Sequence, residues 1–325
     1  MAKENIQFII SFSLMCAKAA GLLGFIALSA MFLIWWERKV SAHIQSRLGP
    51  MIVGWHGSLQ TIADTVKLLL KENIVPEEAD KLSFWLAPVV AFVACFLPFV
   101  AIPFSKTLVA NDLSLGLLYV LAVSSSGVIA IFMAGWGSGN KYSLLGAMRA
   151  SAQIISYEIP LVLSILSIVM LTGTMNMGKI VEAQKGVWFI FYQPAAFIIY
   201  FISALAETNR APFDISEAES ELVAGFHTEY SGMKFSMFFL AEYTNMFTVC
   251  AIAATLFLGG WQGPFLPGIV WFLAKVYFFI FIMMWIRWTF PRLRVDQLMA
   301  LAWKFLVPLA FINILATALV LLLKK

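Results

Sequence analysis

The stretch SFWLAPVVAFVACFLPFVAIPF, residues 83–104, points most directly to the fold class, because it runs for 22 residues without a charged side chain. A helix rises about 1.5 Å per residue, so about 20 apolar residues cross the roughly 30 Å hydrocarbon core of a bilayer. Seven further long, mainly apolar stretches occur, at residues 6–36, 115–136, 154–171, 188–206, 236–258, 268–290 and 303–323. The sequence therefore predicts an all-α polytopic membrane protein with about eight transmembrane helices.

The composition agrees with a membrane location. Of the 325 residues, 61% are hydrophobic and only 12% are charged, whereas soluble domains carry roughly 25% charged residues. We expect residues 1–325 to form a single membrane domain, without an internal repeat or a soluble domain. The first apolar stretch is too long for the core of a secretory signal, so it is expected to be a retained span. The net charge of +4 does not indicate a nucleic-acid partner.

Lysine and arginine are unevenly distributed among the connections. The odd-numbered connections (38–81, 141–149, 210–234 and 292–294) hold twelve of the 22 basic residues, and the even-numbered connections and both tails hold six. The positive-inside rule then predicts that the odd-numbered connections are cytoplasmic and that both termini lie on the periplasmic side. The four cytoplasmic loops would span residues 37–82, 137–153, 207–235 and 291–302.

The first of these loops contains a helix of its own. Between residues 58 and 71, Leu59, Ile62 and Val66 recur at helical spacing, whereas Asp64 and Lys67 fall on the other side. This pattern indicates an amphipathic helix that lies in the membrane interface or packs on a neighbouring protein. The residues alone leave both alternatives open.

Four ionisable residues fall inside predicted spans, where charge is costly and is a functional candidate by default. Glu158 precedes Pro160 in the fourth span, Glu242 lies in the sixth, and Lys275 lies in the seventh. Lys18 can instead extend its side chain to the outer interface, because the first span is longer than a bilayer is thick.

The connection after the fifth span is rich in acids, and Arg210 and Lys234 are the basic residues available there to offset them. Its acids are Glu207, Asp214, Glu217, Glu219, Glu221 and Glu229. Ser216 and Glu219 form a capping box, which is a structural role. The remaining acids form either a solvated face or a cluster that shares protons. Spacing does not decide between them, although the carboxylates inside the spans favour a proton or charge relay.

No catalytic set or metal site is expected. The three cysteines and three histidines stand at none of the spacings typical of zinc, iron–sulfur or redox motifs. The glycine-rich residues 135–141 do not match a phosphate-binding loop. We therefore expect this chain to carry out no bond-making chemistry alone and to bind no cofactor of its own.

Three segments resemble one known family. They are WERKVSAHIQSRLGP (residues 36–50), NKYSLLGAMRASAQIISYE (140–158) and AETNRAPFDISEAESE (206–221), the last continued by HTEYSGMKF (227–235). They are similar to the quinone-site membrane subunit, called the H subunit, of the proton-pumping NADH:quinone oxidoreductase, respiratory complex I. The resemblance extends over nearly the whole chain. One departure is Met51, because the family commonly has an asparagine after Arg-x-Gly-Pro.

The resemblance implies a fold of eight spans with a five-helix half similar to a secondary-transporter repeat. It implies a place in the heel of the membrane arm, in a bacterial plasma membrane. The partners would be the other complex I subunits, including the hydrophilic quinone-site and terminal iron–sulfur cluster subunits, and lipid. The chain would help to enclose a chamber for ubiquinone or menaquinone, the substrate of the complex, and would couple quinone reduction to proton translocation.

The resemblance also assigns two groups of residues. The quinone chamber would be lined or braced by Glu37, Arg38, Gln45, Arg47, Arg287, Arg292 and Arg294, although Arg38 is equally suited to an interfacial anchor. The proton or charge path would comprise Glu158, Tyr157, Glu207, Asp214, Glu217, Glu219, Glu221, Glu229 and Glu242.

Two other functions remain open at this level. A heel subunit of a related membrane-bound hydrogenase or formate-linked complex would share the fold without handling a lipid quinone. The second is a stand-alone ion transporter or receptor, but the polar residues gathered on one side of the membrane argue for an obligate partner.

Overall fold

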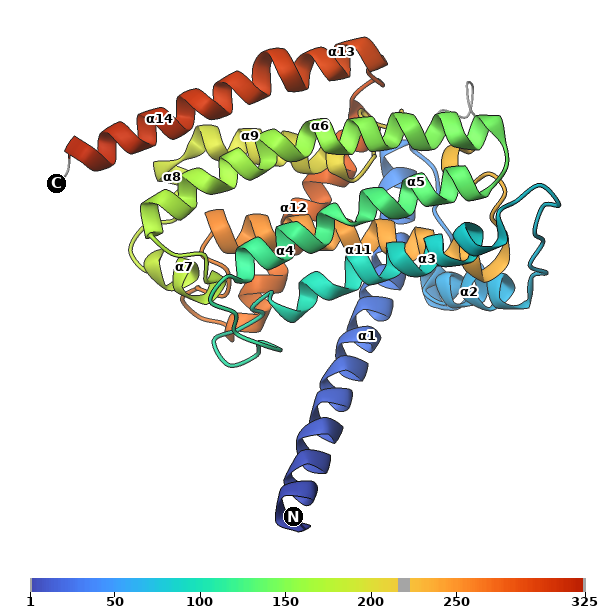
Figure 1. The fold of residues 1–325 in the computed structure, drawn as a ribbon, viewed down its shortest axis with the longest axis horizontal. Coiled ribbons are helices and arrows are strands. Elements are labelled where there is room, and N and C mark those ends of the chain that lie inside the picture. The colour runs from blue at the N-terminus through green and yellow to red at the C-terminus, as the bar shows by residue number, and fades with distance from the viewer. Residues whose placement is uncertain (1, 216–222, 324–325) are drawn as a thin grey trace.

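The computed structural model describes residues 2–215 and 223–323, and all regular structure in this part of the chain is helical (Figure 1). Seven helical segments there are long and apolar enough to cross a membrane. They are α1 (Ala2–Ile44), α3 (Lys81–Phe96) with η2 (Leu97–Val100), α4 (Gly116–Ser125) with α5 (Gly127–Gly137), α6 (Lys141–Thr172), α11 (Gly232–Phe257), α12 (Gly268–Thr289), and α13 (Val295–Ala300) with η4 (Leu301–Leu306) and α14 (Val307–Leu323).

The remaining elements are shorter. They are η1 (Trp55–Gly57), α2 (Gln60–Leu70), α7 (Met177–Ala183), α8 (Phe189–Tyr192), α9 (Pro194–Glu207) and η3 (Gly225–His227). Of these, α9 is an apolar helix of 14 residues and occupies the place of the fifth expected span. With the seven longer segments it makes up the eight apolar segments that the sequence predicts.

Two of the expected spans are interrupted. The third divides into α4 and α5 at Ser126, where the hydroxyls of Ser124 and Ser126 bond back to main-chain carbonyls and compete with regular helix. The fifth divides into α8 and α9 at Gln193, because Pro194 lacks an N–H and disfavours helical geometry in the residue before it. With a rise of 1.5 Å per residue, α9 alone is about 21 Å long, less than the hydrocarbon thickness.

Several helices extend into the connections expected from the sequence. Residues 141–153 belong to α6, which begins after Asn140, whose side chain accepts a hydrogen bond from the Tyr142 N–H. Similarly, α1 continues to Ile44 and α13 begins at Val295. Parts of the expected polar connections therefore belong to helices, which hold their side chains in fixed positions.

The odd-numbered connections meet one another at one end of the bundle. The Leu293 N–H donates to the Pro212 carbonyl, the Ile74 N–H donates to the Ser231 hydroxyl, and Asn140 Nδ2 donates to Glu229 at 2.7 Å. The even-numbered connections meet at the other end, beside α7 and α8 (Figure 1). The chain thus crosses the bundle repeatedly and separates its connections into two sets.

The helix α11 is the most buried of the long helices, and it packs against α1, α3 and α12. In contrast, α1 joins the bundle only through its second half. Its exposed side chains include Phe12, Leu14 and Met15, whereas Ile26, Ala30 and Leu33 are buried. Figure 1 shows the first half of α1 leaving the bundle.

Candidate functional site

The centre of the site is Arg210, which lies in the connection after α9 and has a side chain that is only 2% exposed. Its Nη1 donates to Glu37 Oε2 at 2.5 Å, and its Nε donates to Glu242 Oε1 at 2.9 Å. The guanidinium also lies over the ring of Tyr243, 4.4 Å from its centroid. One buried cation therefore joins two carboxylates from different helices.

A second arginine completes this cluster. Arg287, near the end of α12, donates to the other carboxylate oxygen of Glu37. Glu37 has a side chain 6% exposed and is thus held between two guanidinium groups. Burial alone would lower the pKa of Arg210, but the charges of Glu37 and Glu242 outweigh it and hold that pKa well above its ordinary value. The arginine remains charged.

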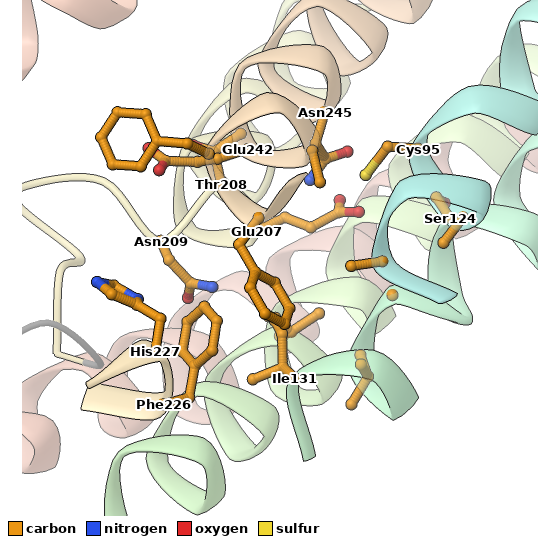
Figure 2. A pocket seen from close by; sticks show the side chains of 18 of the residues that line it. Cys95, Ser124, Ile131, Glu207, Thr208, Asn209, Phe226, His227, Glu242 and Asn245 are labelled. Atoms are coloured by element: carbon orange, nitrogen blue, oxygen red, sulfur yellow. The ribbon is translucent and has the colours of Figure 1, made fainter. Parts of the chain in front are cut away.

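A cavity of about 90 Å³ adjoins Glu242 on the side of α9. Its polar lining includes Glu207, Asn209, His227, Glu242 and Asn245 (Figure 2), and its walls are largely aromatic and aliphatic. Asn209 Oδ1 is buried there without a hydrogen-bond partner. A cavity of this size accommodates water molecules, and the unsatisfied acceptor of Asn209 favours their presence.

Glu158 extends the set of carboxylates beyond the cavity. It accepts a hydrogen bond from the Ser125 hydroxyl, and it interacts electrostatically with Glu207. In Figure 2 the Glu207 side chain extends toward Cys95 and Ser124, on the side away from His227. We call the residues Glu158, Glu207, Glu242, Arg210, Glu37 and Arg287 the charged series. Glu158 and Glu207 interact, Glu207 and Glu242 line the same cavity, and ion pairs join the last four.

The residues after position 222 dock tightly against α6 and carry His227 to the cavity. A Cβ atom at Gly146 would lie 2.8 Å from the Gly225 Cα, so two glycines permit this approach. Ser143 also donates to the Phe226 carbonyl at 3.0 Å. Burial lowers the pKa of the His227 imidazole to about 4, so this side chain is neutral at pH 7.

Of the two basic residues in the acid-rich connection, Arg210 is the one that pairs with carboxylates among the residues that the structure describes. The Lys234 ammonium lies 4.5 Å from the ring centroid of Phe84 and 4.1 Å from that of Trp85, an arrangement typical of cation–π contacts.

The other residues predicted for the quinone chamber lie near the odd-numbered connections, in separate pairs. Arg38 pairs with Asp64 of α2 at 2.6 Å, which holds α2 against α1. Next, Arg47 Nε donates to Gln45 at 2.7 Å. Arg292 bonds to the main-chain carbonyl of Asp214 and lies 3.4 Å from its carboxylate, and the exposed Arg294 lies 3.9 Å from Asp296.

Some residues predicted for the path lie apart from the charged series. The Tyr157 hydroxyl donates to the Leu298 carbonyl of α13, and Glu229 accepts from Asn140. Glu217, Glu219 and Glu221, together with the expected capping box at Ser216, lie outside the described residues.

Sequence reasoning missed Arg210 as a site residue and treated it only as a charge that offsets nearby acids. The available signal was the cost of placing the Glu242 carboxylate inside a span, since a charge there requires a partner of opposite sign. It also missed Asn245 and His227, which face the cavity. Among the described residues, no group of three His, Cys, Asp or Glu side chains is arranged to hold a metal ion.

Comparison with known proteins places this arrangement in a family. The family model described as NADH dehydrogenase matches residues 17–318. The H subunit of NADH-quinone oxidoreductase from Dehalococcoides mccartyi (strain CBDB1) is 58% identical, over 91% of this chain and 84% of the relative. An H subunit of NADH-quinone oxidoreductase from Geobacter sulfurreducens is 52% identical, over 94% of each chain. This multi-pass membrane chain therefore belongs to the NADH dehydrogenase family, among the H subunits of NADH-quinone oxidoreductase.

Proposed function

We propose that this subunit forms part of the quinone-binding chamber of its complex and couples quinone reduction to proton translocation through the charged series. The observation that carries the proposal is the position of Arg210. Its guanidinium joins Glu37 and Arg287, which belong to the predicted chamber, to Glu242, which belongs to the predicted path. The two groups of residues thus meet at one buried guanidinium.

The coupling is electrostatic. Reduction of a quinone creates negative charge and takes up protons, which changes the field at Glu37 and Arg287. Arginine does not release its proton in proteins, so Arg210 responds by shifting between its two carboxylates. A weaker bond to Glu242 favours protonation of that carboxylate, and the cavity supplies the space for water to carry protons between Glu242 and Glu207. Glu158 continues the series from there.

The same proposal covers the setting of the subunit. The odd-numbered connections face the cytoplasm of a bacterium and meet the hydrophilic quinone-site and iron–sulfur subunits, and both termini lie on the periplasmic side. The substrate is ubiquinone or menaquinone. The gathering of Arg38, Arg47, Arg292 and Arg294 near one end of the bundle, together with the count of basic residues, supports this orientation.

Glutamine substitutions in the purified whole complex test the relay. Glu158→Gln, Glu207→Gln and Glu242→Gln each remove a titratable group from the series while keeping its shape. We expect each variant to lower the coupled NADH:quinone reductase rate at least tenfold, or to lower the number of protons moved per electron. Glu182→Gln, an exposed glutamate at the other end of the bundle, is the matched control. Full rate and full pumping in all three variants would disprove the relay.

A further inference from the structure

A groove lies between α1 and the connection that follows η2, at the end of the bundle where the even-numbered connections lie. On α1 it is lined by Lys18, Gly21, Leu22 and Phe25, which are spaced i, i+3, i+4 and i+7 and share one face of the helix. The opposite wall comes from residues 104 and 107–110 and from Ile269. The cavity volume is about 400 Å³, and Lys18 is the one charged side chain among the described residues that line it.

The groove is closed at one end and open at the other. Phe25 packs edge-on against Phe104 and Phe247, with ring centroids 5.2 Å and 5.7 Å apart, and these contacts join α1 to the bundle. The N-terminal half of α1, which carries Lys18, diverges from the neighbouring helices (Figure 1). A Cβ atom built on Gly21 would have no atom within 4 Å, so the side of the groove at this residue is open.

The spacing of basic residues on α1 indicates the depth of the groove in a bilayer. Lys18 and Arg38 stand 20 residues apart on one continuous helix, which corresponds to about 30 Å, the thickness of the hydrocarbon core. If Arg38 lies at one interface, Lys18 lies at the opposite headgroup level. The groove extends from Lys18 toward Phe25, which is the direction of the acyl chains.

We propose that this groove binds one phospholipid, with an acyl chain between α1 and residues 107–110 and with the anionic phosphate at Lys18. The two parts of the site match the two parts of a phospholipid. The apolar groove opens sideways into the hydrocarbon and suits an acyl chain, and Lys18 lies at the headgroup end and suits the phosphate. No carboxylate of the described residues pairs with Lys18, so a lipid phosphate would supply the counter-charge. Lys106, exposed in the adjoining connection, adds a second cation near the headgroup.

Two substitutions separate the parts of this site. Lys18→Gln removes the charge and leaves the groove, whereas Gly21→Leu fills the groove and leaves the charge. Gly24→Leu is the matched control, because Gly24 is equally open but does not line the groove. None of these residues belongs to the charged series, so we expect each variant complex to keep the wild-type reductase rate in detergent. A wild-type rate then shows that the variant complex is intact.

The measurement is phospholipid binding to the delipidated whole complex, by native mass spectrometry during titration with phosphatidylglycerol. We expect Lys18→Gln to weaken binding at one site about fivefold, since a surface cation contributes about 1 kcal/mol toward anionic lipid. Lys18→Arg should restore it. Gly21→Leu should remove that site, and Gly24→Leu should bind as the wild type does.

Equal lipid binding by the wild type, Lys18→Gln and Gly21→Leu would overturn the proposal. It would also fail if a Gly21→Cys variant formed a cross-link to another subunit in good yield, because a protein helix would then fill the groove. The relay experiment measures the reductase rate and proton pumping, whereas the lipid experiment measures lipid binding. Either proposal can therefore be disproved while the other holds.

Discussion

At the scale of single residues, the decisive feature is a pair of carboxylates sharing one buried guanidinium. Burying an isolated charge is so unfavourable that the group would normally neutralise, whereas a paired and hydrogen-bonded charge is tolerated. Arg210 bonds to Glu37 and Glu242 through different nitrogens, so each carboxylate depends on the same cation. Such an arrangement is sensitive to any change in charge at either end, a property that suits coupling.

Removal of this cation should be far more damaging than removal of an exposed one. We expect Arg210→Gln to destabilise the subunit by about 3–5 kcal/mol, because Glu37 and Glu242 would lose their buried partner. Arg38→Gln, which breaks an exposed pair with Asp64, should cost less than about 1 kcal/mol. Thermal denaturation of the purified complex checks both, and equal loss in the two variants would contradict the central role of Arg210.

The buried His227 predicts a dependence of stability on pH. Its pKa in the folded protein is about 4, below the ordinary value of 6.5. Between these values the unfolded chain binds a proton that the folded chain does not, so stability is lost as the pH falls below 6.5. The loss is at most about 2 kcal/mol at pH 5.

The His227→Gln variant should lose this part of the acid sensitivity, and His56→Gln, at an exposed histidine, should keep it. Melting temperatures of the complex between pH 7.5 and pH 5 provide the comparison. Identical pH profiles for the wild type and His227→Gln would show that His227 is not the group responsible.

At the scale of helices, breaks and ends position the functional groups. Pro194 separates α8 from α9, and α9 ends at Glu207, so the connection that carries Arg210 begins beside Glu242. At the opposite end, Lys275 donates to the carbonyls of Leu258, Gly260 and Gln262 at 2.7–2.9 Å. The ammonium thus bonds to the carbonyl of Leu258, the residue that caps α11, and to two carbonyls of the turn that follows. The structure thus gives this lysine a capping role.

The amphipathic helix α2 presents its apolar residues outward. Val66 is 48% exposed, with Ile62 and Leu69 exposed similarly, whereas Asp64 of the same helix pairs with Arg38 of α1. We expect Val66→Glu to lower the amount of assembled complex several-fold, since a charge would enter a face that lipid or a neighbouring subunit covers. Lys67→Glu, one residue away and already polar, is the control. Normal assembly of Val66→Glu would show that this face stays in water.

At the scale of the whole molecule, the alternation of connections creates two different ends. One end gathers the arginines and most of the acids, and the other holds α7, α8 and the contacts of Lys275. Part of the charged series lies near this first end, where Arg210 of the connection after α9 bonds to Glu37 of α1 and Glu242 of α11. A chain with this polarity is suited to receive a charge change at one face and to transmit it into the membrane.

Thiol labelling tests how this polarity is oriented. In a Cys16→Ser background, we expect an impermeant reagent to modify Lys106→Cys in intact cells, because the proposed orientation turns the even-numbered connections outward. Lys141→Cys should react only after the cells are opened and the hydrophilic subunits are washed off. Both positions are exposed in the structure. The reverse pattern would place both termini in the cytoplasm.

The linear sequence was enough to establish the fold class, the number of apolar segments and the presence of charge inside them. These properties are local, because about 20 consecutive apolar residues must cross a bilayer whatever surrounds them. Family membership also followed from contiguous motifs such as residues 36–50 and 206–221. The sequence likewise identified Glu158 and Glu242 as functional candidates, since the cost of a charge in a membrane depends mainly on its position.

Which charges are partners became known only from the folded arrangement. Glu37 and Arg210 are 173 residues apart, and Glu37 and Arg287 are 250 apart, so no periodicity relates them. The fold also turned Arg210 from an offsetting charge into the centre of the site, placed Lys234 on aromatic rings, and divided α8 from α9 within one apolar stretch. The physical reason is that a buried charge is stabilised by atoms close in space, and helix packing alone brings those atoms together.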